Sequence, residues 1–195
     1  MFELPTSIKI DDEELLIRNN GDFRMVLDCF SALNDEELEN DKRVITSLII
    51  FYEGINSIED VFNLPNIEQA VEEMFNFFNC GKKETGYNTK VKLIDWEKDE
   101  MLIASAVNNV ANKEVRQEPY LHWWTFMGYY LAVGESVLST VVSIRNKITK
   151  GKKLEKWEQE FKRDNPNYFI WDKKTEEDRE AEEWGMSMWN GEGGN

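Results

Sequence analysis

Apolar residues recur every three or four positions through most of the region from residue 23 to residue 161, and this spacing is the strongest constraint on the fold. Residues three and four apart lie on one face of an α-helix, so each such stretch predicts a helix with one buried side. Clear examples are residues 23–33, 67–78 and 137–148. The last of these predicts an inward face made of Val137, Val141, Ile144 and Ile148. We therefore expect a mainly α fold.

Three positions carry the signature of a helix N-terminus. Asn34, Ser57 and Asn66 are each followed, three residues later, by an acidic or amide side chain. An Asn or Ser side chain at such a position accepts a hydrogen bond from the free backbone amide three residues later, which favours the start of a helix there. We expect one helix to begin near each of the three.

A small β element is expected before the first helix. Two β-prone runs, residues 7–10 and 15–18, flank the polar run 11–14. Such an arrangement predicts a hairpin over about residues 7–18, although its turn lacks the glycine that would make the signal strong.

The length of 195 residues fits one domain, which we place at residues 1–185. The polar stretch 81–92 holds two glycines and no apolar period, so it is predicted to be a loop. The end of the chain is polar and glycine-rich, and we expect residues 186–195 to form a disordered tail. The fold class predicted is thus a single helical domain with a small N-terminal β-hairpin.

The formal net charge of -15 bears on possible partners. An acidic protein is repelled by phosphate backbones and by anionic lipid surfaces, so we expect no nucleic-acid and no membrane partner. Residues 120–133 are apolar, but a spanning helix needs about 20 such residues, so they predict a buried helix. The N-terminus lacks the basic start and apolar run of a signal peptide, which places the protein in the cytoplasm.

No residue pattern in the chain predicts catalysis. The single histidine, His122, has no nucleophile or orienting carboxylate nearby in the sequence and is interpreted as a packed or surface residue. Cys29 and Cys80 form no CxxC pair, so buried free thiols are the simpler interpretation. We expect no enzyme, no cofactor and no metal.

Four carboxylates at positions 95, 97, 99 and 100 resemble a metal or acid–base cluster at first sight. Their spacing fits neither a calcium-binding loop nor a paired-carboxylate motif. Because they fall where the next helix is predicted to begin, with Asp95 as its cap, a capping role is favoured.

Charge is unevenly distributed. Residues 1–41 hold twelve acids and three bases, whereas residues 145–163 hold eight bases and three acids. Because these two regions carry opposite charge, self-association or pairing with charged partner helices is plausible. A solvated helix of mixed charge is the alternative.

The basic region is followed by aromatic residues in the last third of the chain. Exposed aromatic side chains are favoured anchors of protein interfaces, while packing in the core is the alternative for each of them. The predicted protein-interface residues are Trp157, Phe161, Tyr168, Phe169 and Trp171.

Several strings resemble a known family. They include FELPTSI (2–8), VLDCFSALNDEEL (26–38), FFNCG (77–81), LIDWEKDE (93–100), PYLHWWTFMGYYLAVGES (119–136) and KGKKLEKWEQEFKRDNPNYF (150–169). Together they are similar to the "gene product fifteen" family of siphophages and prophages of Gram-positive bacteria, over about residues 2–171.

The resemblance implies a bacteriophage tail-assembly protein acting in the host cytoplasm. Members are encoded in the tail module beside the tape-measure protein, a position usually held by tail-assembly chaperones. The implied partners are the tape-measure protein and the major tail protein, and the family offers no catalytic or cofactor residues. The alternative is a structural tail or tail-tip component retained in the virion; an acidic DNA mimic or other host-interaction protein fits less well, because basic residues are interspersed.

Overall fold

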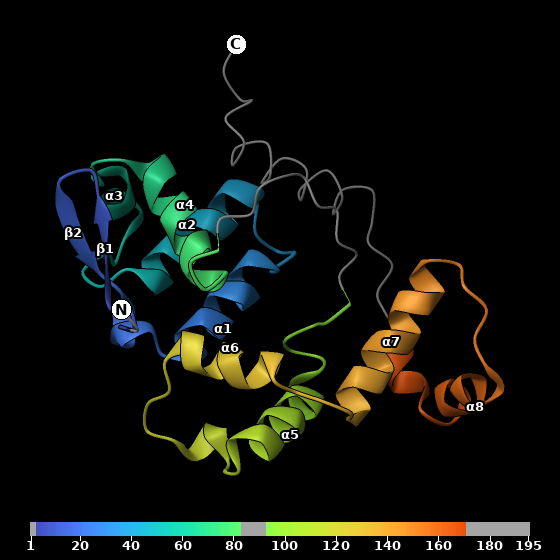
Figure 1. Cartoon of the computed structure of the whole chain (residues 1–195). Coiled ribbons are helices and arrows are strands. Elements are labelled where there is room, and N and C mark those ends of the chain that lie inside the picture. The colour runs from blue at the N-terminus through green and yellow to red at the C-terminus, as the bar shows by residue number, and fades with distance from the viewer. Residues whose placement is uncertain (1–2, 83–92, 171–195) are drawn as a thin grey trace. The chain divides into compact units, whose positions relative to one another are not determined.

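The computed structural model describes residues 3–82 and 93–170, which form eight α-helices, three short 3-10 helices and one two-stranded antiparallel sheet (Figure 1). The mainly α fold with a small N-terminal hairpin is confirmed. Tertiary contacts group the described residues into two compact units, one of residues 3–82 and 120–124, the other of residues 93–119 and 125–170. The single domain at residues 1–185 stays a prediction, and the predicted tail, residues 186–195, lies outside the described residues.

The hairpin of the first unit pairs β1 (Ser7–Ile10) with β2 (Glu13–Leu16), with Ile10 opposite Glu13. Asp11 takes the left-handed conformation at the turn (φ 49°), which Asp tolerates better than most residues. Its backbone N–H donates to the Gln69 side chain at 2.9 Å, and the Ile10 side chain is fully buried. The turn without glycine is therefore held by a helix distant in the sequence.

Four helices complete the main part of this unit: α1 (Phe23–Leu33), α2 (Asn40–Phe51), α3 (Ile58–Phe62) and α4 (Ile67–Phe78). The helix starts predicted at Ser57 and Asn66 are confirmed, because their side chains accept from the backbone amides of Asp60 and Gln69. The start predicted at Asn34 is wrong. Asn34 instead ends α1, donating from its side chain to the Phe30 carbonyl at 2.6 Å.

An aromatic core joins α4 to residues 120–124. Phe51 meets Phe77 and Phe78 edge-on, with ring centroids 5.3 and 5.6 Å apart. The indole N–H groups of Trp123 and Trp124 donate to the carbonyls of Phe78 and Phe77, both at 2.9 Å. Both carbonyls belong to the last turn of α4. The Phe77 carbonyl also accepts from the Cys80 amide at 3.0 Å, whereas the Trp123 indole gives the Phe78 carbonyl a partner that the helix itself does not supply.

The start of α1 is fixed by the same segment. The Asp22 carboxylate accepts from the backbone amides of Arg24 (3.0 Å) and Leu121 (2.9 Å). Gly21, just before it, has φ +76°, and a Cβ there would lie 2.7 Å from the Phe77 ring. Only glycine fits this turn without a shift of its neighbours.

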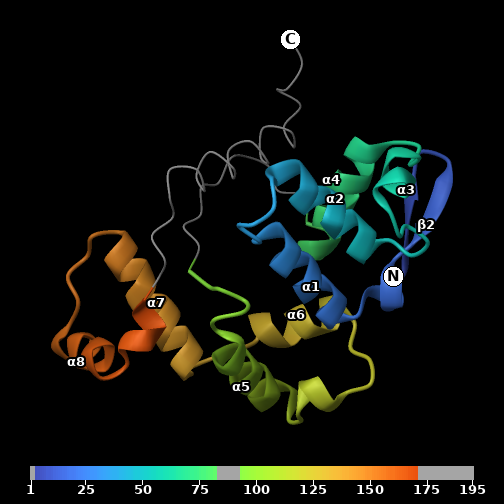
Figure 2. The same ribbon diagram turned by 180° about the vertical axis from the view of Figure 1, so that it is seen from behind.

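The second unit contains α5 (Glu100–Ala111), α6 (Trp123–Leu131) from Thr125 onward, α7 (Val137–Thr149), α8 (Lys156–Asp164) and the 3-10 turn η3 (Pro166–Phe169). In both views α8 and η3 lie beside α7 (Figure 1 and Figure 2). Trp96 packs on Phe126 and Tyr130, with centroids 6.3 and 5.3 Å apart.

The buried face of α7 differs from the prediction. Leu138, Val141 and Ile144 are buried, but Val137 and Ile148, both predicted to face inward, are 50% and 40% exposed. The helix is rotated so that Arg145 takes an inward position. The reason is an ion pair described in the next subsection.

The aromatic stretch 120–133 forms a helix only from Trp123 to Leu131, and Leu131 is exposed. None of the helices in residues 3–82 and 93–170 has both the length and the apolar character that crossing a membrane requires.

Candidate functional site

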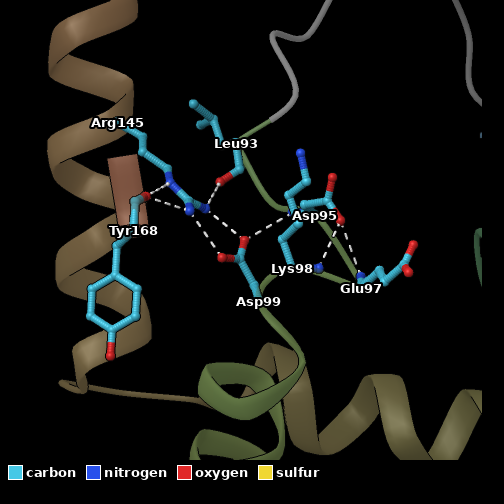
Figure 3. Close-up of polar contacts among 7 residues, drawn as sticks. All are labelled: Leu93, Asp95, Glu97, Lys98, Asp99, Arg145 and Tyr168. Atoms are coloured by element: carbon cyan, nitrogen blue, oxygen red, sulfur yellow. Dashed lines mark hydrogen bonds and ion pairs between the residues drawn. The ribbon is translucent and has the colours of Figure 1, made fainter. Parts of the chain in front are cut away.

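A buried ion pair organises the second unit around Arg145 of α7 (Figure 3). The guanidinium Nη1 lies 2.6 Å from Asp99 Oδ2, and Nη2 lies 2.9 Å from Asp99 Oδ1. The side chains of Arg145 and Asp99 are 6% and 2% exposed. This fork-to-fork geometry gives two charge-assisted hydrogen bonds between the same two groups.

Arg145 also donates to two backbone carbonyls. Its Nη1 reaches the Leu93 carbonyl at 3.0 Å, while Nε and Nη2 reach the Tyr168 carbonyl at 2.9 and 2.6 Å. One side chain therefore fixes the segment before α5 and the turn η3 against α7. The result is a rigid base for the residues around η3.

The capping role predicted for the carboxylates at residues 95–100 needs correction. Asp95 Oδ1 accepts from the backbone amides of Glu97 and Lys98, closing a turn, but α5 begins only at Glu100. Asp99, at the N-cap position, turns its carboxylate to Arg145 and to the Asp95 amide. A partner 46 positions away in the sequence decided its role, and local spacing carries no signal of that partner.

A second ion pair fixes α8. Lys147 Nζ of α7 lies 2.6 Å from Glu158 Oε1, and the Glu158 side chain is 1% exposed. The other oxygen of Glu158 accepts from the Glu155 amide at 2.8 Å at the start of α8. The Lys147 ammonium lowers the pKa of Glu158, and the bond to Glu158 raises the pKa of Lys147. The Lys147–Glu158 ion pair thus holds the inward face of α8 to α7.

The outward face of α8 presents Trp157, which is 51% exposed. Its indole N–H donates to Glu155 Oε2 at 2.9 Å, which restrains the ring on the surface. Ile170, directly after η3, is 65% exposed. Large apolar groups exposed to this degree are available to a partner.

The other predicted interface residues are less accessible. Phe161 and Phe169 are half-buried and meet edge-on at 6.3 Å between centroids, so each packs partly against the other. Tyr168 is half-buried, and its carbonyl is bound by Arg145. Trp171 lies outside the described residues. The structure thus brings Trp157, Phe161, Tyr168 and Phe169 onto adjoining elements, with Trp157 the most exposed.

A run of lysines adjoins this surface in the sequence. Five exposed lysines at the end of α7, in the following loop and in α8 form no ion pair with any described residue. We call them the lysine segment: Lys150, Lys152, Lys153, Lys156 and Lys162. An exposed aromatic anchor beside unpaired positive charge is suited to an acidic, amphipathic partner segment.

A shallow groove of about 650 Å³ lies on the same unit between α5 and α7. Most of its lining side chains are polar, including Asn109, Asn112 and Glu135, and Tyr168 also lines it. Asn108 is already engaged, with its side chain bonded to Glu114 and to the Val115 amide. The groove gathers no set of convergent charged groups.

His122 is buried, as one of the two interpretations from sequence had it. Its Nδ1 accepts from the Trp124 amide at 3.0 Å, so Nε2 carries the proton and donates to the Pro5 carbonyl at 3.0 Å. Burial lowers the pKa of the ring and favours this neutral form. Both ring nitrogens are used in holding the fold.

The cysteines are both free thiols. Cys29 is fully buried, as expected, while Cys80 is only half-buried. Burial raises the pKa of both thiols, which makes the reactive thiolate scarce at neutral pH. Among residues 3–82 and 93–170, His, Cys, Asp and Glu side chains form no group of three or more that could hold a metal ion.

Comparison with known proteins shows a family match. A family model described as "Bacteriophage Gp15 protein" matches residues 1–169, which is most of the chain. No curated protein and no solved structure matches it.

Proposed function

The chain belongs to the bacteriophage Gp15 protein family, and from this premise we propose that it is a tail-assembly chaperone. In this role it binds helices of the tape-measure protein before they enter the growing tail, and it helps to recruit the major tail protein. It acts in the host cytoplasm, without catalysis. Membership of the family supports a phage protein; the finer role is our proposal.

The observation that carries the proposal is the exposed Trp157 beside the lysine segment. A chaperone for long amphipathic helices must cover apolar stripes that would otherwise aggregate. Helix-in-groove recognition uses spaced apolar anchors with flanking charge. Trp157 and Ile170, more than half exposed, supply the anchors, and the lysine segment supplies the charge.

The rigidity beneath this surface supports the same role. Interfaces gain affinity when their anchors are held in place before binding, because less conformational entropy is then lost. Arg145 fixes η3 through the Tyr168 carbonyl, and Lys147 fixes α8 through Glu158. Both anchors therefore sit on elements tied to α7.

Gene position, as the resemblance implies it, supports the choice of partner. Proteins of this family are encoded beside the tape-measure protein, and neighbouring genes of a tail module commonly act on the same assembly step. The half-buried Phe161 and Phe169 add apolar area at the edge of this surface.

The test is co-expression with a fragment of the tape-measure protein encoded by the same phage. We expect the soluble fraction of the fragment to rise severalfold when the chain is present, and the two to co-purify. Purified phage particles should lack the chain or hold only traces of it. An unchanged soluble fraction, or a stoichiometric amount of the chain in particles, would contradict the chaperone role; the second result would favour a structural tail component.

A further inference from the structure

The groove between α5 and α7 of the second unit is lined by carboxamides that the described fold does not use. Its volume of about 650 Å³ falls within the range of about 300–1,000 Å³ typical of ligand sites. Asn109 lines it from α5, and Asn112 lines it from the position that caps the end of this helix. Both residues are exposed, and neither side chain forms a hydrogen bond to any residue of 3–82 or 93–170. No described residue therefore competes with a ligand for these two carboxamides.

Asn108, the neighbour of Asn109, shows what a structural asparagine does at this end of α5. Its Nδ2 donates to Glu114 Oε2 at 2.9 Å, and its Oδ1 accepts from the Val115 backbone amide at 2.8 Å. A carboxamide offers a donor and an acceptor side by side. One residue of an extended main chain presents the same two kinds of group on one side of the strand. Asn109 and Asn112 therefore offer the groove what a main chain needs for pairing.

The spacing of the groups along α5 also suits an extended main chain. Ser105, Asn109 and Asn112 follow one another at four and three positions, which places them on one face of the helix, and Ser105 lines the groove as well. Four residues advance an α-helix by about 6 Å. Main-chain groups on one side of a strand recur about every 6.6–6.8 Å. Ser105 and Asn109 can thus bind main-chain groups two residues apart in one extended segment, and Asn112 lengthens the row.

The floor of the groove is apolar. Leu102 and Ala106 of α5 and Leu138 of α7 line it, and all three side chains are buried. Successive side chains of an extended segment point to opposite sides. Every second side chain of such a segment can therefore meet apolar surface while its main chain meets the row of polar groups.

Glu135 gives the groove a negative charge that no described residue compensates. Two other charged residues that line it, Lys113 and Glu114, pair with Glu118 at 3.3 Å and with Arg116 at 2.8 Å. Glu135 is exposed just before α7 and forms no ion pair within residues 3–82 and 93–170. A basic side chain is the complementary group for a partner to place there.

We propose that this groove binds an extended segment of a partner protein. The carboxamides of Asn109 and Asn112 and the hydroxyl of Ser105 hold the main chain of the segment, and Glu135 accepts a Lys or Arg side chain from it. Main-chain hydrogen bonds give the affinity, and the basic residue gives specificity. The site does not rest on the chaperone role, because it uses neither Trp157 nor the lysine segment.

The first experiment uses an array of acetylated and amidated peptides of random sequence as the probe. Peptides of about eight residues span roughly 27 Å when extended, which is longer than the row. The full-length chain and its Trp157→Ala variant are bound to the array, and peptides that both bind equally are kept, which removes ligands of the Trp157 surface. We expect these peptides to contain Lys or Arg.

The strongest of these peptides is then titrated in solution by fluorescence anisotropy. Methylating its main-chain nitrogens one at a time removes one donor at a time, and we expect at least about tenfold weaker binding at one or more positions. If no peptide is retained from the array, or if methylation weakens binding at no position, the proposal is wrong.

The second experiment removes the carboxamides by Asn109→Ala together with Asn112→Gly. Alanine favours the helix at 109, and glycine tolerates the left-handed φ of 53° at 112, so the melting temperature should stay within a few degrees. We expect at least about tenfold weaker binding of the selected peptide, measured well below the melting temperature. Gln117→Ala, which removes an exposed carboxamide of the same unit outside the groove, should bind as the wild type does. Equal affinities of the two variants would overturn the site.

Glu135→Gln tests the charge. We expect it to weaken binding of the selected peptide about threefold, and to leave unchanged the binding of the same peptide with its basic residue replaced by glutamine. An equal change for both peptides would show that Glu135 meets no basic side chain, and that part of the proposal would be wrong.

Discussion

Arg145 in α7 and Asp99 at the start of α5 form a bidentate ion pair that is almost fully withdrawn from water. The same guanidinium holds the carbonyls of Leu93 and Tyr168, so four segments of the second unit meet at one side chain. Arg145, a charged residue on the inward face of α7, therefore holds these segments of the unit together.

We expect Arg145→Met to lower the free energy of unfolding by about 3–5 kcal/mol, because it leaves the Asp99 carboxylate buried without a counter-charge. Replacing both partners, as Asp99→Leu with Arg145→Met, should cost less than the two single changes added together. Urea denaturation measures both. Arg163→Met is the control, since its pair with Asp164 is exposed and should contribute at most about 1 kcal/mol. A loss from Arg145→Met no larger than from the control would contradict this account.

His122 predicts a dependence of stability on pH. Its folded pKa lies below the ordinary value of 6.5, mainly because burial disfavours the charged ring. The unfolded chain therefore takes up a proton first as the pH falls, and stability is lost from about pH 6.5 down to the folded pKa. For one proton the slope cannot exceed about 1.4 kcal/mol per pH unit.

The measurement compares unfolding free energies of the wild type and His122→Asn between about pH 7.5 and 5.5, a window that spans the ordinary pKa of histidine. The asparagine side chain does not titrate, so the curve of the variant should be flatter over this window. The variant should also be less stable at the upper end, because the hydrogen bond to the Pro5 carbonyl is lost. Parallel curves would show that His122 is as easily protonated in the folded chain as in the unfolded one.

Glu158 predicts a second loss of stability in acid, at lower pH than that of His122. Lys147 holds its folded pKa below the ordinary value of 4.5, so the pair stabilises the fold above pH 4.5 and this stability is lost as the pH falls through the folded pKa. We expect α8 to detach from α7 first in acid. The fluorescence of Trp157, taken as the difference between the wild type and Trp157→Phe at each pH, would report it. In Glu158→Gln the same change should already be partly present at neutral pH; an unchanged signal at both pH values would exclude the mechanism.

The parts of the fold that follow local rules could be predicted from the sequence. Ser57 and Asn66 start helices because the amide that each accepts from lies three residues away, and the hairpin follows from two β-prone runs that are neighbours in the chain. Asn34 carries the same local signal, yet its side chain turns back to the Phe30 carbonyl and ends α1. The same polar side chain can serve either helix end, and local sequence did not decide between them.

The Asp99–Arg145 pair could not be found from spacing, because its partners are distant in the sequence. One signal for it existed. Arg145 lies four residues after Val141 and seven after Leu138, so it continues an apolar face of α7, and a charged residue on such a face requires a buried partner. The predicted inward face included Val137 and Ile148, which are exposed, and it left out Arg145. The need for a buried partner of Arg145 was therefore not recognised. The interface residues of the last third were located by composition, but their exposure depends on how η3 and α8 fold back on α7.

Trp157 gives the sharpest test of the binding surface. Its side chain is half exposed and its polar contact is to Glu155, two residues away, so removal should leave the fold intact. We expect Trp157→Ala together with Trp171→Ala to change the melting temperature by no more than a few degrees and to abolish solubilisation of the tape-measure fragment on co-expression. The matched control is Phe62→Ala in α3, an aromatic side chain that is 65% exposed on the first unit. It should solubilise the fragment as well as the wild type does. If the double variant unfolds, the two tryptophans belong to the core and the binding surface lies elsewhere. If it stays folded and still solubilises the fragment, or if Phe62→Ala fails equally, partner binding does not depend on α8.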